Sequence, residues 1–170
     1  MKIGLISDSH SYMEDDVLAH LKDCDEIWHA GDIGDISVIE KLETLKIPLQ
    51  VVFGNIDTKP LQIEFHEDIC VTREGIKIFM THIGGYPPRY RSRVREILVR
   101  EKPNLYICGH SHILKVMPDR ELDLLHMNPG AIGHHGIHQM RTLLKFEINN
   151  QKISNVNVVE LGRRGKKYVN

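Results

Sequence analysis

Apolar runs alternate with segments of helical periodicity along the first third of the chain. Short, mostly apolar runs that end in polar residues are typical of buried strands. We expect strands at residues 2–7, 26–29 and 49–53, and helices between them at residues 13–22 and 37–45. This β-α-β-α-β order predicts parallel strands, because parallel neighbours need a crossover connection between them. The carboxyl ends of such strands meet at one edge of a sheet.

The second part of the chain is richer in strand-like runs. Arg73-Glu74-Gly75 separates two of them, 68–72 and 76–80, in the manner of a hairpin turn. A basic segment at 88–101 has the pattern of a helix and ends before Pro103. The remaining expected strands are residues 105–108, 113–117, 122–127, 142–148 and 153–160. We expect an α/β fold with two stacked mixed β-sheets flanked by helices, in the layer order α/β/β/α.

Length and composition are those of a single globular domain over residues 1–170. The hydrophobic (41%) and charged (26%) fractions are ordinary for a chain that buries a sizeable core. A net charge of −1 argues against a broad basic surface for nucleic acid. We find no run of the ~20 apolar residues that a membrane span needs, and no signal-peptide pattern. Three widely spaced cysteines predict free thiols, so we expect a cytoplasmic protein.

Five short motifs place metal-ligand side chains at the ends of apolar runs. They are Asp8-Ser9-His10, Gly31-Asp32, Gly54-Asn55-Ile56-Asp57, Thr81-His82 and Gly109-His110-Ser111-His112. Each motif alone is weak, because a Gly-Asp or Gly-Asn pair usually marks only a turn. The ordered set is more specific, and its donors are oxygen and nitrogen atoms without cysteine. Such donors suit a pair of Mn, Fe, Zn or Ni ions better than a structural zinc site, which predicts a two-metal hydrolase.

These motifs, in this order, resemble the blocks of the calcineurin-like metallophosphoesterase superfamily, and the short chain resembles its small prokaryotic phosphodiesterase branch. The resemblance implies seven ligands for two divalent ions, with Mn most expected and Ni, Fe or Zn also compatible. One ion would take Asp8, His10 and His112, the other Asn55, His82 and His110, and Asp32 would bridge both. A bridging carboxylate suits ions ~3.5–4 Å apart, the usual separation in two-metal hydrolases.

The implied reaction is hydrolysis of a phosphoester, with a diester favoured over a monoester, by a hydroxide that the metals generate from water. We name Asn55, Asp57 and His110 as catalytic residues. Asn55 would contact the phosphate, whereas Asp57 either orients a ligand imidazole or only forms a turn. The expected partner is a small organophosphate or nucleotide-like substrate. We expect neither nucleic acid nor membrane as a partner, and leave a homo-oligomer open.

Two positions depart from the family pattern. Ile56 stands where many relatives have a His that helps to protonate the leaving group, and Ile83 stands where a Gly is usual. Two other functions stay open: a nuclease, and a non-catalytic binding scaffold like the retromer subunit that shares the fold and has a degraded metal site. The modest size and the lack of a basic or aromatic platform disfavour the nuclease. The complete ligand set disfavours the scaffold.

Other polar residues carry weaker signals. His29 is expected to fill a strand or support the site rather than bind metal. We expect solvent exposure for the histidine cluster His134, His135 and His138, and a solvated end for the basic run Arg163–Lys167. The arginines of the segment 88–101 are expected to form a solvated helical face, although Arg suits phosphate recognition.

Overall fold

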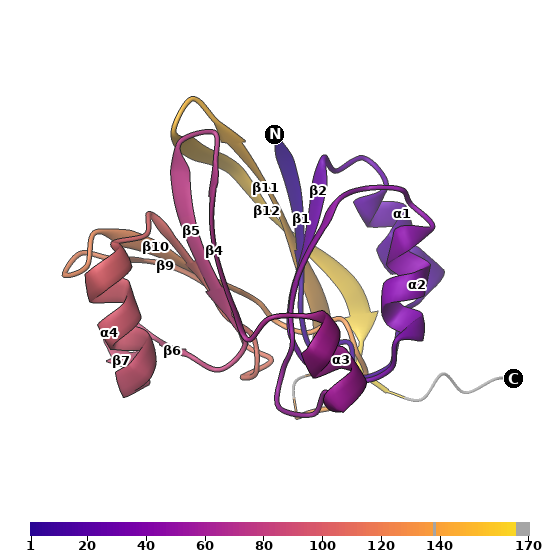
Figure 1. The fold of residues 1–170 in the computed structure, drawn as a ribbon. Helices are drawn as coiled ribbons and strands as arrows, with labels where there is room; N and C mark the ends of the chain where they lie inside the picture. The colour runs from indigo at the N-terminus through magenta and orange to yellow at the C-terminus, as the bar shows by residue number, and fades with distance from the viewer. Residues whose placement is uncertain (138, 166–170) are drawn as a thin grey trace, which may run out of the picture.

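Two five-stranded sheets lie face to face in the computed structural model, which describes residues 1–137 and 139–165 (Figure 1). The first sheet has the order β12 (Lys152–Arg163), β11 (Met140–Asn149), β1 (Lys2–Ile6), β2 (Glu26–Ala30) and β3 (Leu49–Val52). The second has the order β4 (Asp68–Arg73), β5 (Ile76–Thr81), β8 (Leu105–Ile107), β10 (Leu124–Pro129) and β9 (Leu114–Asp119).

Helices cover the outer faces of both sheets, which confirms the expected layer order (Figure 1). The helices are α1 (Asp15–Leu21), α2 (Ser37–Glu43), α3 (Lys59–Glu64) and α4 (Ser92–Glu101). Apolar residues of α1 and α2, such as Val17 and Leu42, pack on the first sheet together with Ile6 and Ile27. On the other side, α4 packs on the second sheet. Each helix therefore buries one apolar face, as amphipathic surface helices do.

The core between the sheets follows from strand alternation. Ile3 and Leu5 of β1 face the second sheet, whereas Ile6 faces the helices. Ile78 of β5 and Ile107 of β8 meet them from the other side. Because both faces of the central strands are covered, their sequences are apolar at nearly every position. The two sheets are thereby held in a fixed relation.

Parallel pairing brings the motif loops to one edge. β1, β2 and β3 pair in parallel in the first sheet, and β5 and β8 do so in the second. The loops after these strands contact one another directly: Asp8 N donates to Gly31 O (2.9 Å), and Gly109 N donates to His82 O (3.1 Å). The backbone N of His110 also donates to Asp8 Oδ2 (3.1 Å), which joins the two sheets.

Two local expectations need correction. The helix expected at 88–101 begins only at Ser92, because the preceding residues form the small ribbon of β6 (Gly85–Tyr86) and β7 (Arg89–Tyr90). The short helix α3 was not expected. The expected hairpin is confirmed, since β4 pairs antiparallel with β5.

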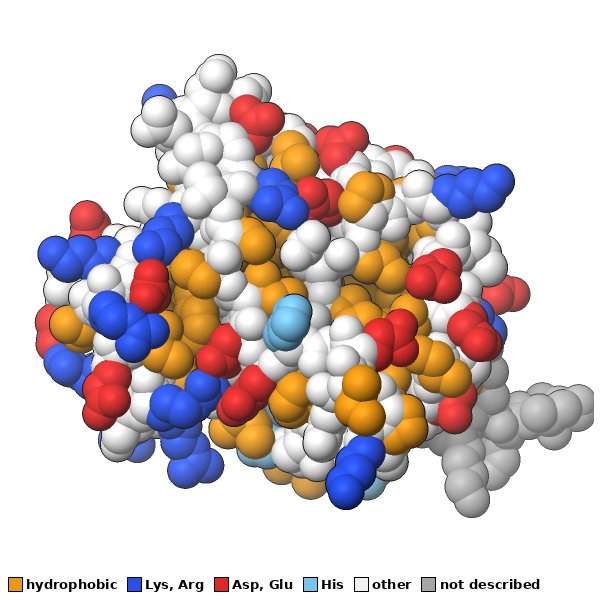
Figure 2. Space-filling view, viewed as in Figure 1, with side chains coloured by type: hydrophobic (Ala, Val, Ile, Leu, Met, Phe, Trp, Pro, Cys, Tyr) orange, Lys and Arg blue, Asp and Glu red, His pale blue; other side chains and the backbone are white. Residues whose placement is uncertain are grey.

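Surface charges around α4 are mixed in sign. Figure 2 shows Lys and Arg side chains gathered over α4, with Asp and Glu side chains between them. Arg93 forms an ion pair with Asp68 (2.6 Å), and Arg95 forms one with Glu121. The helix therefore presents the solvated face expected from its sequence. The three cysteines are free, with Cys24 and Cys108 buried and Cys70 exposed. Among the described residues, no helix has the length and apolar character needed to cross a membrane.

Candidate metal centre

The motif loops adopt unusual backbone conformations. Five expected ligands have a positive φ: Asp8 (54°), His10 (48°), Asp32 (55°), His110 (66°) and His112 (57°). Non-glycine residues in this region cost of order 1–3 kcal/mol each, and such residues cluster at functional sites. The conformation has a geometric effect as well. Side chains at alternate positions of these loops turn toward a common point instead of following the regular projection of a strand.

Glycines allow the loops to approach closely. A Cβ added to Gly54 would lie 2.1 Å from Asp32 Oδ1, and one added to Gly109 would lie 2.0 Å from Ser7 Oγ. Neither position has room for a side chain. The glycines that precede Asn55 and His110 are therefore required by the packing of the loops around the carboxylates.

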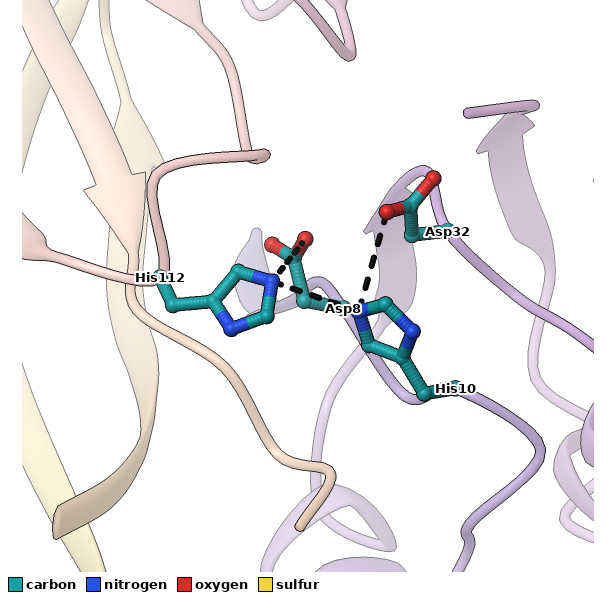
Figure 3. Close-up of side chains that lie close together, drawn as sticks. All are labelled: Asp8, His10, Asp32 and His112. Atoms are coloured by element: carbon teal, nitrogen blue, oxygen red, sulfur yellow. Dashed lines mark hydrogen bonds and ion pairs between the residues drawn. The ribbon is translucent and has the colours of Figure 1, made fainter. Parts of the chain in front are cut away.

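A first group of donors gathers two carboxylates and two imidazoles (Figure 3). Ligand atoms of Asp8, His10, Asp32 and His112 all lie within 4.8 Å of one another. His112 Nε2 lies 3.1 Å from Asp8 Oδ1 and 3.2 Å from His10 Nε2. His10 Nε2 lies 3.6 Å from Asp32 Oδ2. The four side chains come from three separate loops and converge on one space.

A second group consists of Asp32, His82 and His110, whose ligand atoms also lie within 4.8 Å of one another. His82 Nε2 lies 3.1 Å from Asp32 Oδ1, and the rings of His82 and His110 are 5.3 Å apart. Asp32 belongs to both groups and directs one oxygen toward each. This arrangement is the one a bridging carboxylate would need.

A hydrogen bond to the backbone fixes which ring nitrogen of His82 can bind a metal ion. Its Nδ1 lies 2.7 Å from the carbonyl oxygen of Ala30 and donates to it. In the neutral ring, Nε2 then carries a lone pair directed at the Asp32 carboxylate. A carbonyl that orients a ligand imidazole in this way is typical of metal-binding histidines.

Unpartnered atoms show that the residues fit a bound cation. Asp8 Oδ1 and His82 Nε2 are buried, and neither has a hydrogen-bond partner among the described residues. Asp8 Oδ1 lies 3.1 Å from His112 Nε2, and His82 Nε2 lies 3.1 Å from Asp32 Oδ1, so each has another potential metal ligand beside it. Buried polar atoms without partners are rare in folded proteins. A divalent ion in each group would satisfy them with oxygen and imidazole donors. We conclude that the structure has a candidate metal site.

Protonation states agree with this assignment. Burial lowers the pKa of both His10 and His110, so their neutral, ligand-competent forms predominate at neutral pH. Burial acts to lower the pKa of His82 too, but contact with Asp32 and the charge of Asp8 outweigh it and raise this pKa. The pKa of Asp32 is lowered, because the contact with His82 outweighs burial, which by itself would raise this pKa. The contact between the two residues thus favours the charged form of each, and a metal ion at His82 Nε2 would compete with the proton.

The expected Asn55 is exposed and lines a cavity of about 360 Å³ together with His10, Asp32 and His110. Ile56 lines the same cavity and is 41% exposed. Its backbone N donates to Asp32 Oδ1 (3.1 Å). The side chain that replaces the family His therefore lies at the open side of the centre, where a substrate would enter.

Asp57 is buried and takes the turn-forming arrangement. Its carboxylate accepts hydrogen bonds from the backbone N of Gly54 (2.7 Å), Gly34 (2.7 Å) and Ile33 (3.2 Å). These bonds tie the loop after β3 to the loop after β2. Asp57 thus holds the loops that carry Asn55 and Asp32, and the orienting contact to an imidazole is made by Ala30 instead.

Residues near the end of the described chain also reach the centre. The ring of His135 lies 4.7 Å from that of His10, so this exposed histidine forms a rim of the cavity. Arg164 was expected in a solvated end, but it is half-buried, with Nη1 3.1 Å from His112 Nδ1. The expectation was wrong for Arg164, because β12 returns this segment to the metal centre. Residue 138 and the last residues of the basic run lie outside the described residues.

His29 is fully buried and does not lie among the ligands. Its Nδ1 accepts a hydrogen bond from Gly31 N (3.2 Å), and its Nε2 lies 2.9 Å from Ser9 Oγ. Burial lowers the pKa of His29 to about 4, so the ring is neutral. It supports the two loops that carry Asp8 and Asp32, as its sequence context indicated.

Comparison with known proteins identifies the family. Residues 1–151 match the model of the calcineurin-like phosphoesterase superfamily domain. A probable metallophosphoesterase of Methanothermobacter thermautotrophicus is 31% identical over 137 residues, which cover 77% of each chain. The chain therefore belongs to the calcineurin-like phosphoesterase superfamily, and the expected resemblance is confirmed.

Solved structures share the fold at lower identity. A structure described as a novel archaeal phosphodiesterase has a TM-score of 0.76 at 21% identity, covering 95% of this chain and 100% of its own. Vps29 of Entamoeba histolytica complexed with zinc has a TM-score of 0.73 at 18% identity, covering 95% of this chain and 99% of its own. A phosphoesterase predicted in Streptococcus pneumoniae has a TM-score of 0.68 at 22% identity, covering 95% and 88%. At these identities, the likeness concerns the fold.

Proposed function

We propose that the protein is a two-metal phosphodiesterase that hydrolyses small organophosphate or nucleotide-like diesters. The main support is the position of Asp32, whose two carboxylate oxygens face two separate groups of potential metal ligands. Two divalent ions held there, Mn²⁺ foremost, would polarise phosphate oxygens and lower the pKa of an attacking water to roughly 7. Diesters are favoured because the motif set and short chain resemble the prokaryotic phosphodiesterase branch.

The charge balance of the site suits an anionic substrate. Asp8 and Asp32 are the carboxylates of the two donor groups, and the other donors are imidazoles. Two dications against two carboxylates leave about two positive charges for the nucleophile and the phosphate. Asn55 adds a neutral amide at the open side of the cavity, where it can contact a phosphate oxygen without cancelling this charge. The site therefore attracts an anion and orients it.

Backbone contacts hold the site in place before substrate binds. Asp57 fixes the loops of Asp32 and Asn55, and Ala30 fixes the ring of His82. Such preorganisation reduces the rearrangement needed at the moment of reaction. We also propose that the enzyme acts in the cytoplasm, since its free cysteines fit a reducing compartment.

A substrate panel tests the proposal. The protein is treated with a chelator, loaded with Mn²⁺, Ni²⁺, Zn²⁺ or Fe²⁺, and assayed with bis(4-nitrophenyl) phosphate and 4-nitrophenyl phosphate. We expect metal-dependent hydrolysis with the diester preferred. His112→Ala should abolish it, whereas His20→Ala, which removes an exposed imidazole of α1, should not. Absence of turnover with every metal, despite metal binding, would favour the binding-scaffold alternative.

A further inference from the structure

A second cavity, of about 140 Å³, lies against the metal centre. It shares His110 and Ser111 with the wider cavity that contains Asn55 and His112. A substrate with its phosphate at the metal centre can therefore place an attached organic group on the far side of His110. Five of the seven expected ligands line the wider cavity, which leaves the smaller one for a group that does not react.

One wall of this smaller cavity is fixed by packing on β8. A Cβ added to Gly84 would lie 1.7 Å from Tyr106 Oη, so the loop after β5 sits directly on that ring. Tyr106 Oη donates to Gly85 O (3.2 Å), and Cys108 Sγ donates to the same oxygen (3.4 Å). The cavity is thus formed before a ligand arrives, as binding pockets usually are.

Size and lining select a small planar group. A cavity of about 150 Å³ holds one benzene ring, so this one matches a single six-membered ring. Ile83, Tyr86 and Ile113 contribute apolar surface. Lys115 Nζ lies 3.4 Å from the centre of the Tyr86 ring, and Arg91 also lines the cavity. Apolar walls with cations beside them suit an aromatic ring attached to an anion.

His126 adds a buried aromatic ring to this lining. The side chain is 1% exposed, and its ring stacks on that of Tyr106 at 5.0 Å. Its Nδ1 is buried without a hydrogen-bond partner in the described part of the chain. Burial lowers the pKa of His126 to about 4, so the ring is neutral.

We propose that this cavity binds the organic group of the substrate, a single six-membered aromatic ring. An aryl ester and a pyrimidine nucleotide share this chemistry, and we expect a fused ring to bind less tightly in a cavity of about 140 Å³. The proposal rests on the proposed phosphodiesterase function and adds a substrate class to it.

Non-hydrolysable phosphonates test the proposal by binding alone. Isothermal titration calorimetry of the Mn²⁺-loaded protein compares methylphosphonate with 4-hydroxyphenylphosphonate and a hydroxynaphthyl phosphonate. Burying the ring should make the hydroxyphenyl compound bind at least about tenfold more tightly than the methyl compound. The naphthyl compound should lose this gain. Binding of the naphthyl compound as tight as that of the hydroxyphenyl compound would overturn the size argument.

A matched pair of variants tests whether the gain in affinity from the ring arises in this cavity. Ile113→Trp, at a position 42% exposed on the cavity wall, should reduce the ratio of hydroxyphenyl to methyl affinity to about one. Val116→Trp, at a position 40% exposed on β9 outside the cavity lining, should preserve the ratio. An unchanged ratio in Ile113→Trp would overturn the proposal.

The binding results separate a failure of the ring site from a failure of the proposed function. If methylphosphonate binds in a metal-dependent way and the ring adds nothing, the ring site is overturned while the proposed function stands. If no phosphonate binds, the ring site is overturned, and hydrolysis of bis(4-nitrophenyl) phosphate decides the proposed function separately. A methylenephosphonate analogue of thymidine 5′-phosphate, compared with the hydroxyphenyl compound, separates the two sources of the ring, since the tighter ligand identifies a pyrimidine nucleotide or an aryl ester.

Discussion

Replacing Asp32 by Asn should remove both metal ions at once. Among the described residues, Asp32 is the member shared by the two donor groups, with one oxygen toward His82 and one toward His10. Asn preserves the size of the side chain and one oxygen, so the hydrogen bond from Ile56 N can persist. The charge and the second oxygen are lost. His112→Ala, in contrast, removes a donor from one group alone.

The magnitude follows from binding linkage. An ion present at 100 times its Kd stabilises the folded protein by about 2.7 kcal/mol, so two ions contribute roughly 5 kcal/mol. For a domain of this size, each kcal/mol shifts Tm by about 2–4 °C. Metal should therefore raise the Tm of the unmodified protein by roughly 10–20 °C. The rise should be about half as large in His112→Ala and nearly absent in Asp32→Asn.

Scanning calorimetry of chelator-treated protein with and without Mn²⁺ measures these shifts, and elemental mass spectrometry counts the bound ions. Asp123→Asn, at an exposed position between β9 and β10, serves as the control and should show the full shift. The expected ion counts are two for the control, one for His112→Ala and none for Asp32→Asn. A full Tm rise with two ions in Asp32→Asn would show that the bridging assignment is wrong.

Three further predictions concern protons. Protonation of the imidazole ligands competes with metal, so metal affinity and hydrolysis should fall below about pH 6, and a profile flat from pH 8 to about 4.5 would rule out this donor set. Burial lowers the pKa of His126 to about 4 in the folded protein. The neutral ring therefore contributes up to ~3 kcal/mol to the free energy of unfolding above about pH 6.5, and this contribution is lost as the pH falls toward 4. His126→Phe should therefore weaken the pH dependence of urea unfolding of the metal-free protein in this window, and an unchanged dependence would refute the assignment. Ile56→His should accelerate hydrolysis of esters with basic leaving groups more than that of nitrophenyl esters, because general acids contribute ~10²–10⁴-fold when the leaving group is basic. Equal slopes of rate against leaving-group pKa in both proteins would place the proton donor elsewhere.

The convergence of the ligands could be predicted because it depends on a general rule. Asp8, Asp32 and Asn55 each follow a strand of a parallel set, and the carboxyl ends of parallel strands share one edge. The apolar runs located those strands to within a few residues. What the runs could not show was how Asp8 and His10 face the same point, since this depends on positive φ values in the loop.

Other features depend on tertiary contacts that leave no local pattern. The six residues of α3 are too few to establish a helical period around Pro60. Arg164 reaches His112 because of where β12 ends, which the composition of a basic run does not indicate. The two roles considered for Asp57 could be separated only by its hydrogen bonds to backbone amides. In each case, the missing information was the position of a distant segment.

The most direct test of the two-metal account is hydrolysis of bis(4-nitrophenyl) phosphate during stepwise addition of Mn²⁺ to chelator-treated protein, with bound metal counted in the same samples. Negligible turnover is expected without metal, with a rate that rises to a plateau as the second equivalent binds. Turnover that is complete at one bound ion, or that survives full removal of metal, would contradict it.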